Sequence, residues 1–268
     1  MSDDYRNQDN GLLFKFMPFN LFALQTIVNN SLYFNKPDLL NDPLDCRFEI
    51  DIRNIENFSR STVEQIRQRR PFLVQNLDLQ TRNVMLYQNQ ALQKKFLDDF
   101  FKFDFNDNYG ICSFSQTINE TLLWSHYADR TKGICIAFNK QKLIDSLVLY
   151  CDHSFYRCEH GPVRYNGVKK LSIRLFKNHG LSYSKRHLYS KTKHWSYEKE
   201  FRIVLRKILK PTFTFSYPQD FIRTIHFSKD AIHSIILGEK IDAQNEKLLF
   251  QIIQNGNLDI PIKQYLFQ

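Results

Sequence analysis

Glycine and proline are scarce in this sequence, which has eight of each among 268 residues. This scarcity argues against collagen-like and low-complexity disordered chains, which are rich in both residues. No apolar run approaches the roughly 20 residues of a membrane-spanning helix. The polar beginning, MSDDYRNQDN, also lacks the apolar core of a secretory signal. We therefore expect a cytoplasmic protein without a membrane partner.

Motifs of three common enzyme classes are missing. No G-x-G-x-x-G segment follows a candidate strand, which disfavours a Rossmann dehydrogenase. The sequence has no G-x4-G-K-[ST] motif, which excludes a P-loop nucleotidase. Without G-x-S-x-G it also lacks the nucleophile elbow of a serine hydrolase. Any chemistry must therefore be carried by other residues.

The five cysteines do not form a dense disulfide framework. Cys112 and Cys135 lie in apolar, strand-like runs, where a reduced thiol behaves as a small hydrophobic side chain. A Cys-x-His unit occurs twice in CDHSFYRCEH, at Cys151, His153, Cys158 and His160. Structural zinc sites more often use Cys-x2-Cys or His-x3-His spacings. We expect a reducing compartment and no bound metal.

Positive charge exceeds negative charge, since 37 Lys and Arg against 28 Asp and Glu give a net charge of +9. This excess favours anionic partners: nucleic acid, a phosphate-bearing small molecule or an acidic protein surface. If nucleic acid binds, its phosphates would contact a basic group made of Lys185, Arg186, Lys191 and Lys193. No known nucleic-acid-binding motif accompanies the charge, so an ordinary solvated surface is the alternative.

Apolar strand-like runs and amphipathic segments follow one another without regular alternation. Strands are predicted at GLLFKFMPF, YGICSFS, GICIAF, EFRIVL and IPIKQYLF. Asn20 would cap a helix, LFALQTIVNN, with an apolar stripe of Leu21, Leu24 and Val28. Residues 57–103 read as a helical insertion. We predict one α+β domain over residues 1–268, with a mixed or mainly antiparallel sheet and flanking helices.

Two carboxylates, Glu198 and Glu200, precede the strand in WSYEKEFRIVL. Alternate residues of a strand share a face, so Glu198, Glu200 and Arg202 would point the same way. Phe201 and Ile203 would then anchor the other face in the core. The charged face is either the rim of an edge strand or the polar floor of a cleft, and the pattern leaves both open.

The chain as a whole resembles a bacterial family known as domain of unknown function 2971. The resemblance rests on FKFMPFN, LYFNKPDLLNDPLD, GICSFSQTINETLLWSHYADRTKGICIAF, WSYEKEFRIV and IHSIILG, in this order. NDP-x-D, WSHYA and YEKE-x-R are its most specific motifs. The layout is in turn similar to ADP-ribosyltransferase-like domains, with a basic or His residue on an early strand and a catalytic Glu on a late one.

The second resemblance implies an enzyme that uses NAD, for ADP-ribosyl transfer or NAD hydrolysis, in a bacterial toxin or phage-defence effector. Glu200 would hold the ribose 2′-hydroxyl and stabilise the developing cation, while Glu198 would orient or deprotonate an acceptor. Lys15 would occupy the early-strand position, where the pattern more often has His or Arg. The alternative for Lys15 is the outward residue of an ordinary strand.

The remaining candidates for NAD binding lie in the signature motifs: Asn41, Asp42, Asp45, Trp124, His126, Tyr127 and Arg202. Each motif also has a structural interpretation. Asn-Asp-Pro is a natural turn, an aromatic pair at helical spacing usually belongs to a core, and a lone helical His is more often structural. We predict that Glu200, Trp124, Lys15 and the turn at residues 41–45 line one cleft. A non-catalytic nucleic-acid-binding or regulatory domain is the alternative function.

Overall fold

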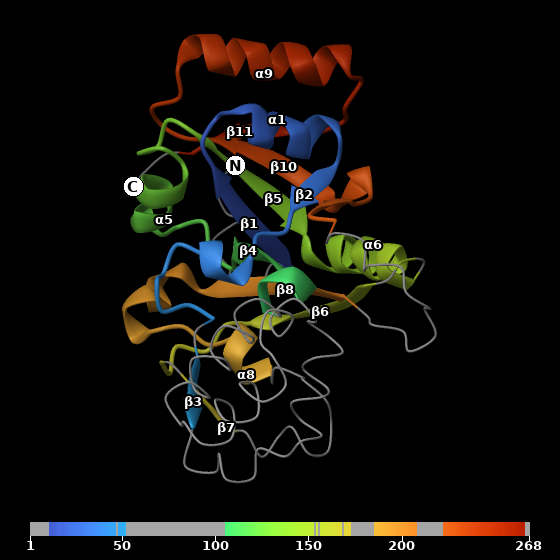
Figure 1. Cartoon of the computed structure of the whole chain (residues 1–268). Coiled ribbons are helices and arrows are strands. Elements are labelled where there is room, and N and C mark those ends of the chain that lie inside the picture. The colour runs from blue at the N-terminus through green and yellow to red at the C-terminus, as the bar shows by residue number, and fades with distance from the viewer. Residues whose placement is uncertain are drawn as a thin grey trace, which may run out of the picture. The chain divides into compact units, whose positions relative to one another are not determined.

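The computed structural model describes residues 11–46, 48–51, 105–152, 154, 156–167, 169–172, 185–207 and 222–265 (Figure 1). The chain divides into two compact units, and each is described by itself. The first unit comprises residues 1–35, 109–165 and 193–268, and the second comprises residues 36–108 and 166–192. The predicted helical insertion at residues 57–103 lies outside the described residues.

A seven-stranded sheet organises the first unit, in the order β11-β10-β5-β1-β4-β8-β6. Its strands are β1 (Leu12–Met17), β4 (Tyr109–Ser115), β5 (Ile134–Asn139), β6 (Tyr156–Pro162), β8 (Glu200–Lys207), β10 (Ile232–Leu237) and β11 (Ile262–Gln264). Neighbouring strands run antiparallel except β10 and β11, which are parallel. The prediction of an α+β fold with a mixed, mainly antiparallel sheet is confirmed.

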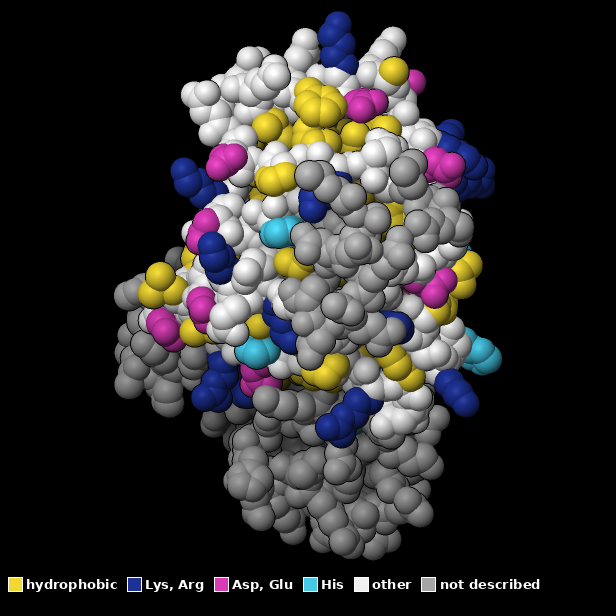
Figure 2. Space-filling view, turned by 180° about the vertical axis from the view of Figure 1, so that it is seen from behind, with side chains coloured by type: hydrophobic (Ala, Val, Ile, Leu, Met, Phe, Trp, Pro, Cys, Tyr) yellow, Lys and Arg dark blue, Asp and Glu magenta, His cyan; other side chains and the backbone are white. Residues whose placement is uncertain are grey.

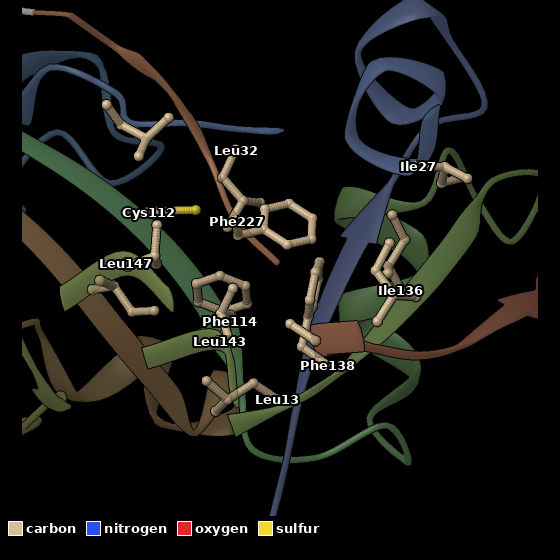
Figure 3. Close-up of a cluster of buried hydrophobic side chains, with 14 of the residues drawn as sticks. Leu13, Ile27, Leu32, Cys112, Phe114, Ile136, Phe138, Leu143, Leu147 and Phe227 are labelled. Atoms are coloured by element: carbon tan, nitrogen blue, oxygen red, sulfur yellow. The ribbon is translucent and has the colours of Figure 1, made fainter. Parts of the chain in front are cut away.

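The main hydrophobic core covers one face of this sheet. Helices α1 (Leu21–Val28), α6 (Lys140–Asp152) and α9 (Ala243–Asn255) contribute buried side chains to it. At its centre, Phe138 makes edge-to-face contacts with Phe114 and Phe227, with ring centroids 5.7 and 5.5 Å apart (Figure 3). A two-stranded pair, β2 (Ser31–Tyr33) and β9 (Thr224–His226), adds Leu32 and Ile225 to the same core.

A smaller core covers the opposite face. Helix α5 (Thr121–Tyr127) places Trp124 there, against Phe14 of β1 and Cys135 and Ala137 of β5. Strand alternation explains the division, because Phe14 and Phe16 point to this side while Leu13 points to the main core. The short elements η5 (Lys193–Glu198) and η6 (Lys229–Ala231) complete the described part of the first unit.

Helix α1 confirms its predicted cap but not its predicted stripe. The Asn20 side chain accepts a hydrogen bond from the backbone N–H of Ala23 at 3.1 Å. Leu21 and Val28 are nevertheless 66% and 47% exposed, so the stripe built on them is wrong. The buried residues are Ala23, Thr26 and Ile27, which also have helical spacing. Thr26 joins them because its hydroxyl donates to the Phe22 carbonyl oxygen at 3.0 Å, which leaves its methyl group to pack.

The second unit contains a parallel pair of short strands, β3 (Phe48–Asp51) and β7 (Lys169–Ser172). It also contains η1 (Pro37–Leu39), the turn at residues 41–46 and the short helix α8 (Lys185–Leu188). The Asn106 side chain accepts a hydrogen bond from the Asp38 backbone N–H at 3.1 Å and so joins two separate segments of this unit.

Candidate active site

Strand β8 is an interior strand, paired with β4 on one side and β6 on the other. Glu200 lies opposite Ser115, and Arg202 lies opposite Ser113 and Gly161. Glu200 and Arg202 are only 3% and 0% exposed. The edge-rim interpretation is therefore wrong, because the strand has neighbours on both sides and its charged groups are buried.

The alternation predicted for β8 holds from Glu200 onward. Phe201 and Ile203 lie in the main core, as predicted, with 2% and 0% of their surface exposed. On the other face Arg202 and Glu200 form a two-point ion pair: Nε lies 2.6 Å from Oε1, and Nη2 lies 3.0 Å from Oε2. Such a paired geometry offsets part of the cost of removing both charges from water.

Glu198 does not belong to the strand, and its predicted place on the Glu200 face by strand alternation is wrong. It ends η5, and Lys199 follows in the left-handed backbone conformation with φ 43°. This conformation breaks the extended geometry on which the alternation depends. The end of β4 holds the turn, since the Ser115 hydroxyl donates to the Glu198 carbonyl oxygen at 2.7 Å. The Gln116 backbone N–H donates to the Lys199 carbonyl oxygen at 3.0 Å.

The Glu198 side chain nevertheless turns inward and is 4% exposed. Its Oε1 accepts a hydrogen bond from the hydroxyl of Tyr127, on α5, at 2.5 Å. Burial raises the pKa of Tyr127 well above its ordinary value, and the bond to Glu198 raises it further. Tyr127 therefore keeps its proton and remains a donor. The contact brings together the WSHYA and YEKE motifs.

Tyr165 lies beside the two carboxylates, Glu198 and Glu200. Its hydroxyl oxygen accepts a hydrogen bond from the Glu200 backbone N–H at 2.7 Å. Burial raises the pKa of Tyr165, and the charges of Glu200 and Glu198 add to that increase. The same two carboxylates also raise the pKa of Tyr127. The charges of Glu198 and Glu200 therefore raise the pKa of both tyrosines, so the four residues share one electrostatic environment.

An aromatic cluster adjoins Glu198 and reaches the surface. It consists of His126, Tyr127, Trp195 and Tyr197. The His126 ring centroid lies 6.3 Å from that of Tyr127 and 6.4 Å from that of Tyr197. Trp195 follows, with its ring 6.0 Å from Tyr197. His126 is exposed, and the other three are half-buried. Planar groups of this kind are suited to stacking against a base or a nicotinamide ring.

Trp124 has a different environment from its neighbours in the WSHYA motif. It is fully buried, and its indole N–H donates to the Ile118 carbonyl oxygen at 3.0 Å. Phe16 packs edge-on at 5.0 Å, and Tyr265 lies at 4.7 Å. Because these contacts enclose the ring in the smaller core, the structural interpretation of Trp124 is favoured over stacking on a ligand.

Lys15 lies on the opposite face of the sheet from Glu200. The register pairs Phe14 with Ser115, which shares a face with Glu200, so the next residue of β1 points to the main core. There the Lys15 ammonium donates to the Ser113 carbonyl oxygen at 3.1 Å and lies 5.2 Å from the centroid of the Phe114 ring. The structure therefore does not bring Lys15 together with Glu200.

The turn at residues 41–45 belongs to the second unit. Asp42 accepts hydrogen bonds from the Leu44 backbone N–H at 2.9 Å and from the Thr192 hydroxyl at 3.4 Å. A hydrogen bond from the backbone N–H two residues later to the Asp side chain is the defining contact of an Asx turn. Whether this turn shares a cleft with Glu200 stays a prediction.

The same turn surrounds Lys191. The Lys191 ammonium lies 3.8 Å from the Asp45 carboxylate and 3.4 Å from the Asn41 side-chain oxygen. Lys191 is 3% exposed and Asp45 4%. The prediction that Lys191 contacts nucleic-acid phosphates is therefore wrong, because its charge is buried against Asp45. The NDP-x-D motif therefore supplies Asn41 and Asp45 as the partners of Lys191, which lies far along the chain.

Sequence reasoning missed Tyr165 and Ser115. Ser115 alternates with Phe114 along β4. Once the pairing of β4 with β8 is known, Ser115 is expected beside Glu200 on the same face of the sheet. Tyr165 follows the end of β6 without any periodic pattern. Only the pairing of β6 with β8 brings it close to Glu200.

Comparison with known protein families gives a match over part of the chain. A family model described as a protein of unknown function (DUF2971) matches residues 123–203. This span is similar to the DUF2971 family. It begins one residue before Trp124, ends on β8, and contains both Tyr127 and Glu198, so the DUF2971 match includes both motifs of the site. The predicted family is confirmed over this span. No curated protein and no solved structure matches the chain.

Two further features concern only the described residues. Among the described helices, none is long and apolar enough to cross a membrane. Within the same part of the chain, no three His, Cys, Asp or Glu side chains gather in a way that could hold a metal ion.

Proposed function

We propose that the chain is an NAD-using enzyme, which transfers ADP-ribose or hydrolyses the dinucleotide at the site around Glu198. The observation that carries this proposal is the burial of two carboxylates, Glu198 and Glu200, at the entry of one strand. Buried charges are costly to keep, and groups held in this way are concentrated at functional sites.

The contacts suggest different roles for the two carboxylates. Glu200 is engaged by the Arg202 guanidinium at two points, so much of its charge is offset. Glu198 accepts a hydrogen bond from Tyr127, a neutral donor that belongs to the aromatic cluster. We therefore assign Glu198 to the ribose 2′-hydroxyl and the developing cation, and Glu200 with Arg202 to positioning the strand entry.

The aromatic cluster supports a ligand with a flat ring. Tyr197 precedes Glu198 in the chain, and its ring neighbours His126, which is exposed. A nicotinamide ring stacked there would bring the adjoining ribose towards Glu198. The net charge of +9 favours association with the pyrophosphate of NAD.

The test is to incubate the purified chain with NAD, with and without nucleic acid, and to follow nicotinamide release. Parallel measurements use Glu198→Gln and, as the matched control, Glu239→Gln, which alters an exposed carboxylate of the same unit. Turnover in the parent and the control, with a loss in Glu198→Gln, supports the proposal. Absence of turnover in the parent, or equal turnover in all three proteins, contradicts it.

A non-catalytic regulatory or binding domain is the second candidate. It is favoured by the structural roles of several signature residues, since Trp124 lies in a core and Asp45 is paired with Lys191. In Figure 2 the described Lys and Arg side chains of the visible face are mixed with Asp and Glu side chains. If nucleic acid binds, the affinity should fall steeply as salt rises.

A further inference from the structure

Helix α6 and strand β6 bring two cysteines together in the first unit. The buried stripe of α6 consists of Leu143, Ile144, Leu147 and Cys151, all in the main core. Cys151 is therefore the last member of a helical face that packs on the sheet. It is 4% exposed, and the helix ends one residue later.

Cys158 reaches the same place from the sheet. It lies opposite Leu205 of β8, and Leu205 belongs to the main core, so strand alternation directs Cys158 towards the side that α6 covers. Cys158 is half-buried and packs against that core. The two cysteines therefore enter the same space between the helix and the strand.

Ser154 is hydrogen-bonded to the end of α6. Ser154 donates to the Cys151 carbonyl oxygen twice, from its backbone N–H at 3.0 Å and from its hydroxyl at 3.2 Å. Strand β6 begins two residues later at Tyr156, whose hydroxyl oxygen accepts from the Ile222 backbone N–H at 2.7 Å.

The Cys151 and Cys158 thiols interact, and each is the largest cause of the shift in the other's pKa. The interaction with Cys158 lowers the pKa of Cys151 below its ordinary value. The interaction with Cys151 raises the pKa of Cys158, and burial raises it further. One member of the pair is thus favoured as a nucleophile, and the other carries the proton.

We propose that Cys151 and Cys158 form a redox pair, which closes to an intramolecular disulfide on reaction with a small hydroperoxide such as hydrogen peroxide. The Cys151 thiolate attacks one peroxide oxygen, the O–O bond breaks, and the departing hydroxide takes a proton to become water. Cys158 gives up its proton and attacks the resulting sulfenic acid at the Cys151 sulfur. The S–O bond breaks and the second water leaves.

The step balances, because two thiols are oxidised to one disulfide while one peroxide is reduced to two waters. It requires no catalysis by Glu198, so it is independent of the function proposed above. Cys112 and Cys135 provide internal controls, since burial raises the pKa of both thiols whereas the pKa of Cys151 is lowered. Buried, protonated thiols of this kind are unreactive.

The test treats the full chain with hydrogen peroxide, blocks the remaining thiols with an alkylating reagent and digests without reduction before mass spectrometry. The expected product is a Cys151–Cys158 linked peptide, two hydrogens lighter than the reduced pair, which dithiothreitol returns to two alkylatable thiols. Cys112 and Cys135 should remain reduced. Cys158→Ser should instead stop at an oxidised Cys151, whereas Cys112→Ser should form the linked peptide like the parent.

Three outcomes overturn the proposal. Both thiols could remain alkylatable at peroxide concentrations that oxidise free cysteine in the same tube. Disulfides could instead join separate chains, seen as a dimer band without reductant. Irreversible oxidation of either residue in the parent, with no linked peptide, would also contradict a pair that closes on itself. Because the main measurement uses the parent protein, poor folding of a variant leaves the conclusion intact.

Discussion

The Tyr127 hydroxyl donates to the Glu198 carboxylate across 2.5 Å, although the two residues are 71 positions apart in the chain. The bond fastens α5 to the turn that precedes β8. Both residues lie within residues 123–203, the span that the DUF2971 family model matches.

Replacing Glu198 by Gln should remove most NAD turnover. The amide keeps the shape of the side chain but cannot supply the negative charge that stabilises a ribosyl cation. We expect a loss of about 100-fold or more in nicotinamide release, the scale for one major electrostatic group. Glu239→Gln should behave like the parent. Turnover of Glu198→Gln within about threefold of the parent would exclude the role assigned to this carboxylate.

Replacing Tyr127 by Phe should reduce stability, because a buried oxygen of Glu198 loses its donor. The expected cost is about 1–3 kcal/mol in the free energy of unfolding, measured by urea denaturation. Tyr33→Phe is the matched control, since Tyr33 is 49% exposed and should change stability by less than about 0.5 kcal/mol. Equal stability of the two variants would show that the Tyr127 bond contributes nothing to the fold.

Replacing Arg202 by Met should be strongly destabilising. The change leaves the Glu200 carboxylate buried without its guanidinium, for which about 3–5 kcal/mol is typical. The double variant Glu200→Gln/Arg202→Met should regain a large part of that loss, because it leaves no unpaired charge. A double-mutant cycle by thermal or urea denaturation measures the coupling. Simple additivity of the two single changes would contradict the ion pair.

Replacing Lys191 by Met should destabilise the second unit far more than the same change at Lys193. Lys191 is 3% exposed and paired with Asp45, whereas Lys193 is exposed. We expect a cost of about 3 kcal/mol or more at Lys191 and less than about 0.5 kcal/mol at Lys193. The free energies of unfolding of both variants, measured by urea denaturation, test this difference. A similar small effect at both positions would indicate that Lys191 is solvated.

Some of the site was readable from local pattern. The alternation in EFRIVL predicted that Phe201 and Ile203 face the core while Glu200 and Arg202 share the other face, and the structure agrees. The cap at Asn20 was equally local. Such features depend on backbone geometry within a few residues, so the sequence by itself determines them.

Other features depended on contacts between distant segments. Pairing with β4 and β6 made β8 an interior strand and buried Glu200, while the register of β1 directed Lys15 to the opposite face. The sequence predicted Lys191 as a surface charge, whereas the structure pairs it with Asp45. The tertiary structure alone decided these points, because burial and ion pairing depend on neighbours far along the chain, which local pattern does not specify.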